Sequence, residues 1–192
     1  LTEGLGYSPL QTGLSFIPVV AGIIATSTLA GSPVAARFGP RSVITAGSVI
    51  AALGLMWQTT AGLDSAFVAD LLPGLTLYGL GLGLVFGRLQ EAATARAERR
   101  DVGVASAMIN ASQEVGGAAG TALVSSLAAA AAAAFVATAP PSATLSASAT
   151  VESYQAALWA AFALYVIAAT VSALLFRRGV VEIDPTAEPI AH

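Results

Sequence analysis

The 192-residue sequence contains no cysteine and no lysine, and its single histidine, His192, is the last residue. The absence of cysteine excludes disulfides, thiolate metal sites and cysteine nucleophiles. One histidine excludes a histidine-based catalytic pair or metal cluster, and without lysine there is no Gly-Lys-Ser/Thr phosphate loop. Most enzyme classes depend on catalytic or ligand-binding residues that are absent from this sequence. We therefore expect a protein that is not an enzyme and that binds no cofactor or metal.

Charged residues are also scarce. They make up 10% of the chain, against about a quarter in soluble domains, while 56% is hydrophobic and the mean hydropathy is +0.78. The longest stretches without a charge cover residues 4–36, 42–63, 71–87, 115–151 and 153–176. About 20 apolar helical residues cross a hydrocarbon core of ~30 Å. The composition predicts an all-α, polytopic membrane helix bundle.

Five membrane spans follow from these stretches. They are predicted at residues 13–35, 43–62, 67–86, 103–127 and 155–176, within a transmembrane domain of residues 1–178 and before a C-terminal tail of residues 179–192. The fourth helix is expected to continue over 127–136. Residues 139–150, which begin with two prolines and are rich in Ser and Thr, are predicted to form an exposed loop.

Arginine occurs in alternate connections only. The first connection, the third connection and the segment after the fifth span hold all eight: Arg37, Arg41, Arg88, Arg96, Arg99, Arg100, Arg177 and Arg178. Cytoplasmic loops carry an excess of basic residues. This segregation predicts an outside N-terminus and a cytoplasmic C-terminus in a plasma membrane, as an odd number of spans requires. A soluble helical bundle would not produce it.

Glycines recur every four residues in two of the predicted spans. Gly79, Gly83 and Gly87 share one helical face, and Gly116 and Gly120 share another. In lipid, such strips let helix backbones approach closely, so they indicate helix packing. A dinucleotide-binding loop is excluded, because it would have to follow a strand and meet water.

A polar cluster interrupts the fourth span. Glu114 lies about 16 Å along a helix that begins at Gly103, near the middle of the membrane. Asn110 shares its face, and Gln113 is adjacent. A carboxylate at that depth is typical of a proton relay or an ion pair. The alternative is a helix that begins later and leaves Glu114 near the headgroups. Asn110, Gln113 and Glu114 are the candidates for substrate or proton contact.

The connection "RLQEAATARAERRD" combines four arginines with three acids. It predicts a short amphipathic helix on the membrane surface, with Arg88 paired to Glu91 and other arginines near lipid phosphate. Its net charge of about +1 is too small for a nucleic-acid phosphate track. We expect membrane lipid, and no nucleic acid, as its partner.

Four segments in order resemble a known family. The segments "GYSPLQTGLSFIPVVAGI", "AARFGPRSVITAG", "LPGLTLYGLGLGLVFG" and "VGVASAMINASQEVGGAAGTAL" resemble the C-terminal part of major facilitator superfamily multidrug efflux pumps, in the fourteen-helix drug:proton antiporter branch. The resemblance runs from Gly6 to about Leu127 and is weaker in the last span. It implies the last five helices of a major facilitator fold, with the N-terminal half of the transporter missing from this chain.

The resemblance also implies residue roles. Arg37, Gly39 and Arg41 match the family's cytoplasmic loop signature, but Ala36 replaces its acid, so we expect the two arginines to fix topology more than gating. Gln113 and Glu114 stand where relatives tend to have arginine before glutamine. The candidacy of Glu114 therefore rests on its depth and not on a family role.

The expected function is part of a secondary active transporter in the bacterial inner membrane. It would export lipophilic small molecules in exchange for protons, with the proton gradient as its coupling force. An exporter of one metabolite or antibiotic is an alternative that the same helices would serve. A non-transporting membrane fragment is another, because the chain opens with "LTEGLGYSPLQTG", lacks an initiating methionine and reads as a piece of a longer protein.

Overall fold

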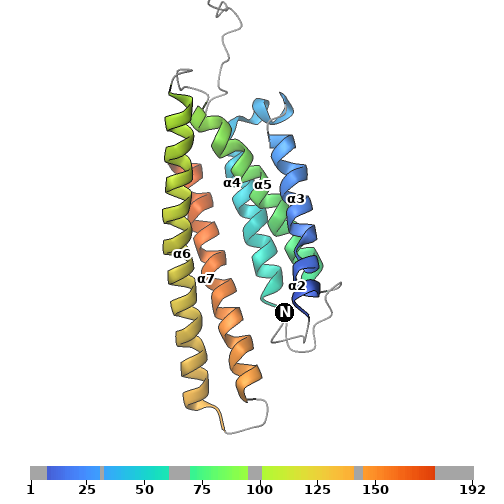
Figure 1. The fold of residues 1–192 in the computed structure, drawn as a ribbon, viewed down its shortest axis with the longest axis vertical. Coiled ribbons are helices and arrows are strands. Elements are labelled where there is room, and N and C mark those ends of the chain that lie inside the picture. Colours follow the sequence, from blue (N-terminus) through green and yellow to red (C-terminus); the bar gives the residue numbers. More distant parts are fainter. Residues whose placement is uncertain (1–7, 31–32, 61–69, 95–100, 141–144, 176–192) are drawn as a thin grey trace, which may run out of the picture.

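The computed structural model describes residues 8–30, 33–60, 70–94, 101–140 and 145–175, whose regular structure is helical throughout. The long helices stand side by side and alternate in direction along the chain (Figure 1). The helices are α2 (Pro9–Ser15), α3 (Ile17–Ala30), α4 (Pro33–Gln58), α5 (Leu72–Thr94), α6 (Val102–Thr138) and α7 (Leu145–Leu175). The prediction of an all-α membrane helix bundle is confirmed.

Four helices, α4 to α7, are long and apolar enough to cross a membrane. The first predicted span, 13–35, is not one helix: the chain breaks at Phe16 between α2 and α3, α3 ends at Ala30, and α4 already begins at Pro33. Pro18 explains the break, since it has no N–H to donate to the carbonyl one turn earlier. The Phe16 N–H donates to the Gly13 carbonyl at 3.1 Å and closes a tight turn there.

The loop predicted at residues 139–150 is shorter than expected. α6 ends at Thr138 and α7 begins at Leu145, so the prediction was wrong for residues 145–150, which are helical. Their hydroxyl groups explain this. Thr150 donates to the Ser146 carbonyl at 2.9 Å and Ser153 to the Thr150 carbonyl at 2.7 Å, so these side chains bond within the helix instead of ending it.

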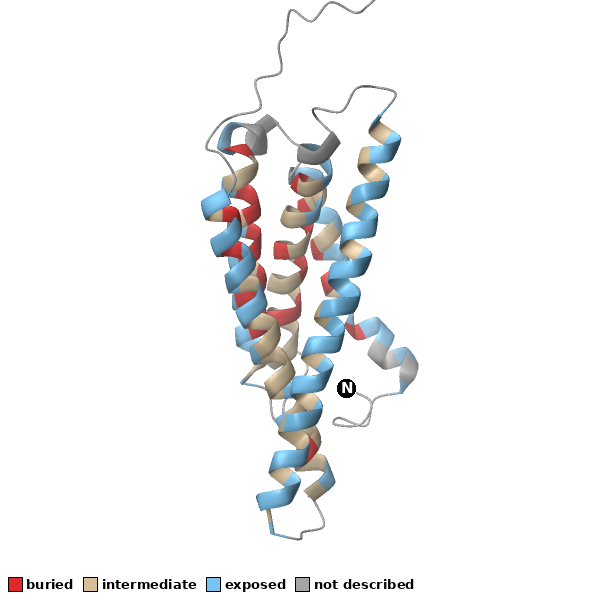
Figure 2. Ribbon diagram, turned by 90° about the vertical axis from the view of Figure 1, so that its left-hand side faces the viewer, coloured by how far each residue is buried: buried red, intermediate tan, exposed pale blue. Residues whose placement is uncertain are grey.

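The core forms where α5 packs between α3 and α4, and α7 packs on α4. Buried residues, red in Figure 2, lie on α3, α4 and α5, and the largest group of them lies on one face of α4. They include Ile44, Ser48, Ala51, Ala52 and Leu55. Small residues on this face let the axes of α4 and α5 approach closely, and close packing of this kind stabilises helix association in lipid.

The helix α6 stands at the edge of the bundle. It packs against α7 and touches α5 only slightly, and none of its residues is buried. Large side chains such as Met108 and Val115 are 67% and 71% exposed. Figure 2 shows α6 exposed along most of its length. One whole face of this membrane helix is therefore left open by the chain.

The helix α4 bends sharply at Gly39. This glycine has φ 70° and ψ 159°, a conformation that L side chains rarely adopt, and Pro40 follows it. Proline is well suited to the first turn of a helix, where its missing N–H has no partner to lose. The main part of α4 therefore begins anew at Pro40.

Candidate functional site

The open face of α6 carries the predicted polar residues Asn110 and Glu114. Both are exposed, and neither forms a hydrogen bond or ion pair with another described residue. Since α6 begins at Val102, Glu114 lies ~18 Å from the start of the helix. The helix therefore does not begin later than predicted, while the depth of Glu114 in the membrane stays a prediction. A carboxylate and an amide thus project from the first third of an apolar helix.

Gln113 lies apart from this pair. It is half-buried, and its Nε2 atom is buried without a hydrogen-bond partner among the described residues. It lines a shallow groove of about 360 Å³ between α5 and α6, and the lining residues are Leu89, Met108, Ile109, Ser112 and Gln113. The Ser112 hydroxyl donates to the Met108 carbonyl at 2.8 Å. The amide of Gln113 is therefore the free donor of this groove.

The structure thus divides the three candidates between two surfaces. Asn110 and Glu114 share the open face, with Gly117 next along it, whereas Gln113 is turned towards α5. A bound molecule that reached both surfaces would have to wrap around the α5-facing edge of α6. Within the described residues, no group of His, Asp and Glu side chains is placed to hold a metal ion.

The predicted glycine strips have different surroundings. Gly79 and Gly83 face α3, where an added Cβ would collide with the carbonyl of Val19 and with Thr26. Gly87 is half-buried. Gly116 and Gly120 have no atom within 4 Å of an added Cβ, so none of the described helices packs on them.

A second glycine contact, between α4 and α5, was not predicted. A Cβ on Gly81 would lie 2.5 Å from the Ala51 nitrogen, and one on Gly54 would lie 2.6 Å from the Tyr78 nitrogen. The contact residues Gly47, Gly54, Gly74 and Gly81 are seven apart on each helix. That seven-residue spacing was the signal that could have revealed it.

Two polar contacts tie α5 to its neighbours. The Thr26 hydroxyl of α3 lies 2.8 Å from the carbonyls of Gly22 and Leu80, so it bridges α3 and α5. The rings of Tyr78 and Tyr165 meet edge to face at 5.8 Å, with their hydroxyl oxygens 3.5 Å apart, and join α5 to α7. The tyrosine pair was not predicted, and tyrosine inside an apolar helix was its only signal in the sequence.

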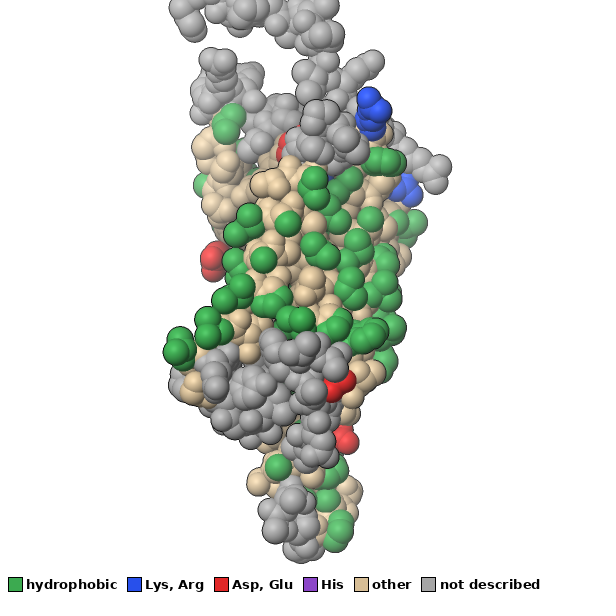
Figure 3. All heavy atoms as spheres, turned by 90° about the vertical axis from the view of Figure 1, so that its right-hand side faces the viewer, with side chains coloured by type: hydrophobic (Ala, Val, Ile, Leu, Met, Phe, Trp, Pro, Cys, Tyr) green, Lys and Arg blue, Asp and Glu red, His purple; other side chains and the backbone are tan. Residues whose placement is uncertain are grey.

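The described arginines occupy one end of the bundle. Arg37 and Arg41 flank the bend at Gly39, the first exposed and the second half-buried. Basic side chains are seen near one end of the face drawn in Figure 3, while hydrophobic side chains cover the middle. The charged end and the apolar middle give the bundle the polarity of a membrane protein.

Arg88 departs from its predicted place. It lies within α5, which continues to Thr94, and it is 4% exposed instead of lying on the surface. Its predicted ion pair with Glu91 is present, formed between Nη1 and Oε2 one helical turn apart. The first part of the amphipathic helix predicted over residues 88–101 is therefore the C-terminal end of α5. Residues 95–100 fall outside the described part of the chain.

The chain has relatives among known resistance and export proteins, although no family model matches it. It is 33% identical over 168 residues to the puromycin resistance protein pur8 of Streptomyces alboniger, covering 86% of this chain and 33% of the relative. It is 32% identical to a probable actinorhodin transporter of Streptomyces coelicolor, covering 66% and 22% of the two chains.

A third relative is a multidrug resistance protein B homolog of Mycobacterium tuberculosis. The identity is 34%, over 66% of this chain and 24% of the relative. The chain thus spans a third or less of the length of these proteins. Within that span, the chain is a homologue of the drug and antibiotic exporters of the major facilitator superfamily.

Proposed function

We propose that this chain is the C-terminal membrane part of a secondary transporter that exports lipophilic small molecules in exchange for protons. The observation that carries the proposal is the open face of α6, where Asn110 and Glu114 project without a partner from an apolar helix. Polar groups in a membrane helix normally face a bundle interior or a water-filled cavity. The export function of the relatives supports the same proposal.

The open face of α6 implies that another part of the transporter covers it. The missing N-terminal half would cover α6 and enclose a cavity, with Glu114 and Asn110 on its surface. Exchange would then proceed by rocking of one half against the other about this site, and proton binding to Glu114 would alter the preferred state. No covalent step is needed, so the protein would not be an enzyme.

The proposed orientation follows from the arginines. With the arginine end of the bundle in the cytoplasm, the start of α3 and the α6–α7 connection lie outside. The N-terminus is then outside and the C-terminus is cytoplasmic. The membrane is the bacterial inner membrane.

The test is efflux of a lipophilic cationic dye by cells that produce the full-length protein, measured across external pH. We expect Glu114→Gln to slow efflux and to flatten its pH dependence, because the amide keeps the shape of the side chain but cannot exchange a proton. Glu152→Gln is the matched control, since it makes the same change at an exposed glutamate near the start of α7, outside the candidate site. If Glu114→Gln left both the efflux rate and its pH dependence unchanged, the proposal of a proton site at Glu114 would be wrong.

A second candidate is export of one antibiotic instead of many drugs. The names of two relatives, which refer to puromycin resistance and actinorhodin transport, favour it. Growth protection against a panel of unrelated antibiotics separates the two. Protection against a single structural class would support the specific exporter, and protection against several classes the multidrug exporter.

A further inference from the structure

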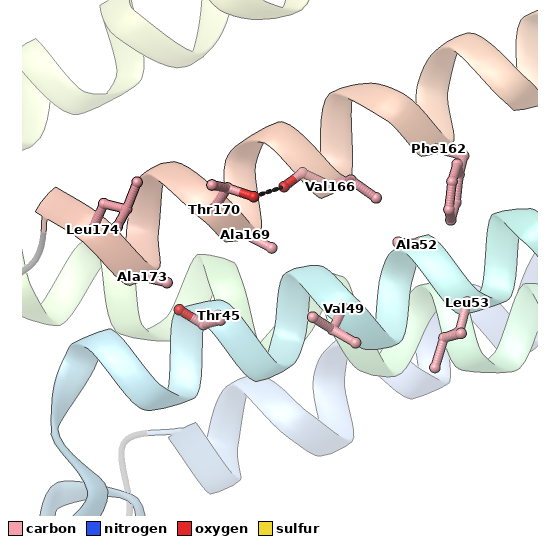
Figure 4. A pocket seen from close by; sticks show the side chains of 10 residues that line it. All are labelled: Thr45, Val49, Ala52, Leu53, Phe162, Val166, Ala169, Thr170, Ala173 and Leu174. Carbon is pink, nitrogen blue, oxygen red and sulfur yellow. Dashed lines mark hydrogen bonds between the residues drawn. The ribbon is translucent and has the colours of Figure 1, made fainter.

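The helices α4 and α7 enclose a groove on the outside of the bundle. It has a volume of about 460 Å³, and all of its lining residues come from these two helices (Figure 4). Small side chains such as Ala52 and Ala169 form its floor, and larger ones such as Val49 and Phe162 form its walls. Val49, Leu53 and Leu174 in the lining are 45%, 46% and 76% exposed, so the groove opens towards the surroundings of the bundle.

One hydroxyl in this apolar groove has no partner. The Oγ1 atom of Thr45 is buried, and no described residue forms a hydrogen bond with it. Thr170, across the groove, differs because its hydroxyl donates to the Val166 carbonyl of its own helix at 2.8 Å (Figure 4). A buried polar group that is left unpaired is costly, so Thr45 calls for a hydrogen-bond acceptor or donor from outside the chain.

A cation lies at the same end of the groove. Arg41 precedes Thr45 by one helical turn and therefore occupies the same side of α4. It is half-buried, whereas Arg37 lies beyond the bend at Gly39 and is exposed. The helix that restarts after Gly39 also directs its positive N-terminal end to this level. Arg41 is not itself a lining residue, but its place one turn before Thr45 puts a cation next to one end of a groove that is lined by apolar residues apart from two threonines.

We propose that this groove binds an anionic phospholipid. Its phosphate pairs with Arg41, an ester carbonyl accepts the hydrogen bond of Thr45, and one acyl chain lies between α4 and α7. The dimensions agree, since Thr45 and Leu53 are ~12 Å apart along α4 and one leaflet of hydrocarbon is ~15 Å deep. Basic pockets between membrane helices are a known way to hold lipid headgroups.

The order of chemical groups along the groove favours a phospholipid over a second copy of the chain. A phospholipid has an anion, an ester and a hydrocarbon chain in this sequence along the membrane normal, and the groove presents their complements in the same sequence. A second copy of the chain would have to supply a hydrogen-bonding group at the level of Thr45, whereas every phospholipid carries an ester at that depth. This site is separate from the proposed transport face on α6, so it does not depend on the exchange mechanism.

Native mass spectrometry of the purified protein tests the proposal, with phosphatidylglycerol and phosphatidylcholine as the probes. One arginine near an anionic surface contributes ~1 kcal/mol, so the wild type should retain phosphatidylglycerol about fivefold more than phosphatidylcholine. Arg41→Gln should bring this ratio to about one. Arg37→Gln is the matched control and should leave it unchanged. A ratio that falls only in Arg37→Gln would overturn the site.

A second variant and a measurement on the wild type cover the acyl chain. Ala52→Phe fills the floor of the groove and should abolish retention of both lipids. For the wild type, a phosphatidylglycerol with a photoreactive acyl chain should label residues 45–53 and 162–174. Labelling confined to α6 would contradict the proposal. So would displacement of the lipid by the transported drug, or a change of oligomeric state in Ala52→Phe with lipid retention intact.

Discussion

At the scale of single residues, glycine has two roles in this chain that its spacing does not distinguish. Gly81 touches the backbone of α4, and a Cβ there would lie 2.5 Å from the Ala51 nitrogen. Gly116 lies on open α6, with nothing within 4 Å. The first is required by the contact between two helices. The second only lowers the helix propensity of its own segment.

Alanine substitution should separate these roles. We expect Gly81→Ala to lower the free energy of unfolding by about 1–3 kcal/mol, because the added methyl group must push α4 and α5 apart. Gly116→Ala should be neutral or raise it by up to about 1 kcal/mol, since alanine favours the helix. Thermal unfolding in detergent, followed by circular dichroism, measures both. Equal effects at the two positions would refute the distinction.

Helical periodicity was enough to place Asn110 and Glu114 on one face, because residues four apart always share a side of a helix. It could not place Gln113, whose surroundings depend on how closely α5 approaches α6. For the same reason Arg88 was assigned to the surface, although it is buried. Sequence predicts which side of a helix a residue occupies but not which neighbour covers it.

At the scale of elements, the bend in α4 depends on Gly39. Its φ of 70° allows the short segment that begins at Pro33 to leave the axis of the longer helix that begins at Pro40. The bend also sets the height of Arg37 relative to Arg41. A continuous helix would move Arg37 away from the end of the bundle, so this single dihedral angle positions both charges.

Gly39→Ala should therefore be destabilising. An alanine held in this conformation costs about 1–3 kcal/mol, and the helix would relieve the strain by straightening or by losing its first turn. Gly103→Ala is the matched control, since that glycine is helical and has nothing within 4 Å of an added Cβ. Unfolding in increasing sodium dodecyl sulfate provides the measurement. A Gly39→Ala protein as stable as the control would show that the bend is not enforced here.

The existence and order of the helices could be predicted because uncharged stretches of membrane length are unambiguous. Their ends could not. Ser and Thr near residue 150 suggested a loop, yet their hydroxyls bond to carbonyls of α7 and let the helix begin at Leu145. Pro18 had the opposite effect and divided the first predicted span into α2 and α3. Local hydrogen bonding decided both cases.

At the scale of the whole molecule, the described arginines lie at one end of the bundle, whereas α6 ends and α7 begins at the other. The proposed topology places these ends on opposite sides of the membrane. These 192 residues contain no cysteine, so a thiol introduced here competes with no other thiol of this segment. Phe38 and Thr138 are suitable positions, since both are exposed.

In intact cells, Thr138→Cys should react with a membrane-impermeant maleimide, and Phe38→Cys should react only after the cells are permeabilised. The parent protein without an introduced cysteine is the control for non-specific labelling. The reverse pattern would invert the topology. Reaction of both thiols from outside would contradict a membrane-crossing bundle in which these residues lie at opposite ends.

The length of α6 has a further consequence for its depth in the bilayer. Its 37 residues measure about 55 Å, whereas a helix tilted by 40°, the upper end of the usual range, places only about 39 Å in hydrocarbon. About eleven residues must therefore stand in water, most simply the alanine-rich stretch over 128–138. A methyl side chain loses little hydrophobic free energy on leaving lipid. Because each alanine loses less than a larger apolar side chain would, the α6–α7 hairpin can extend beyond the bilayer at a low cost per residue.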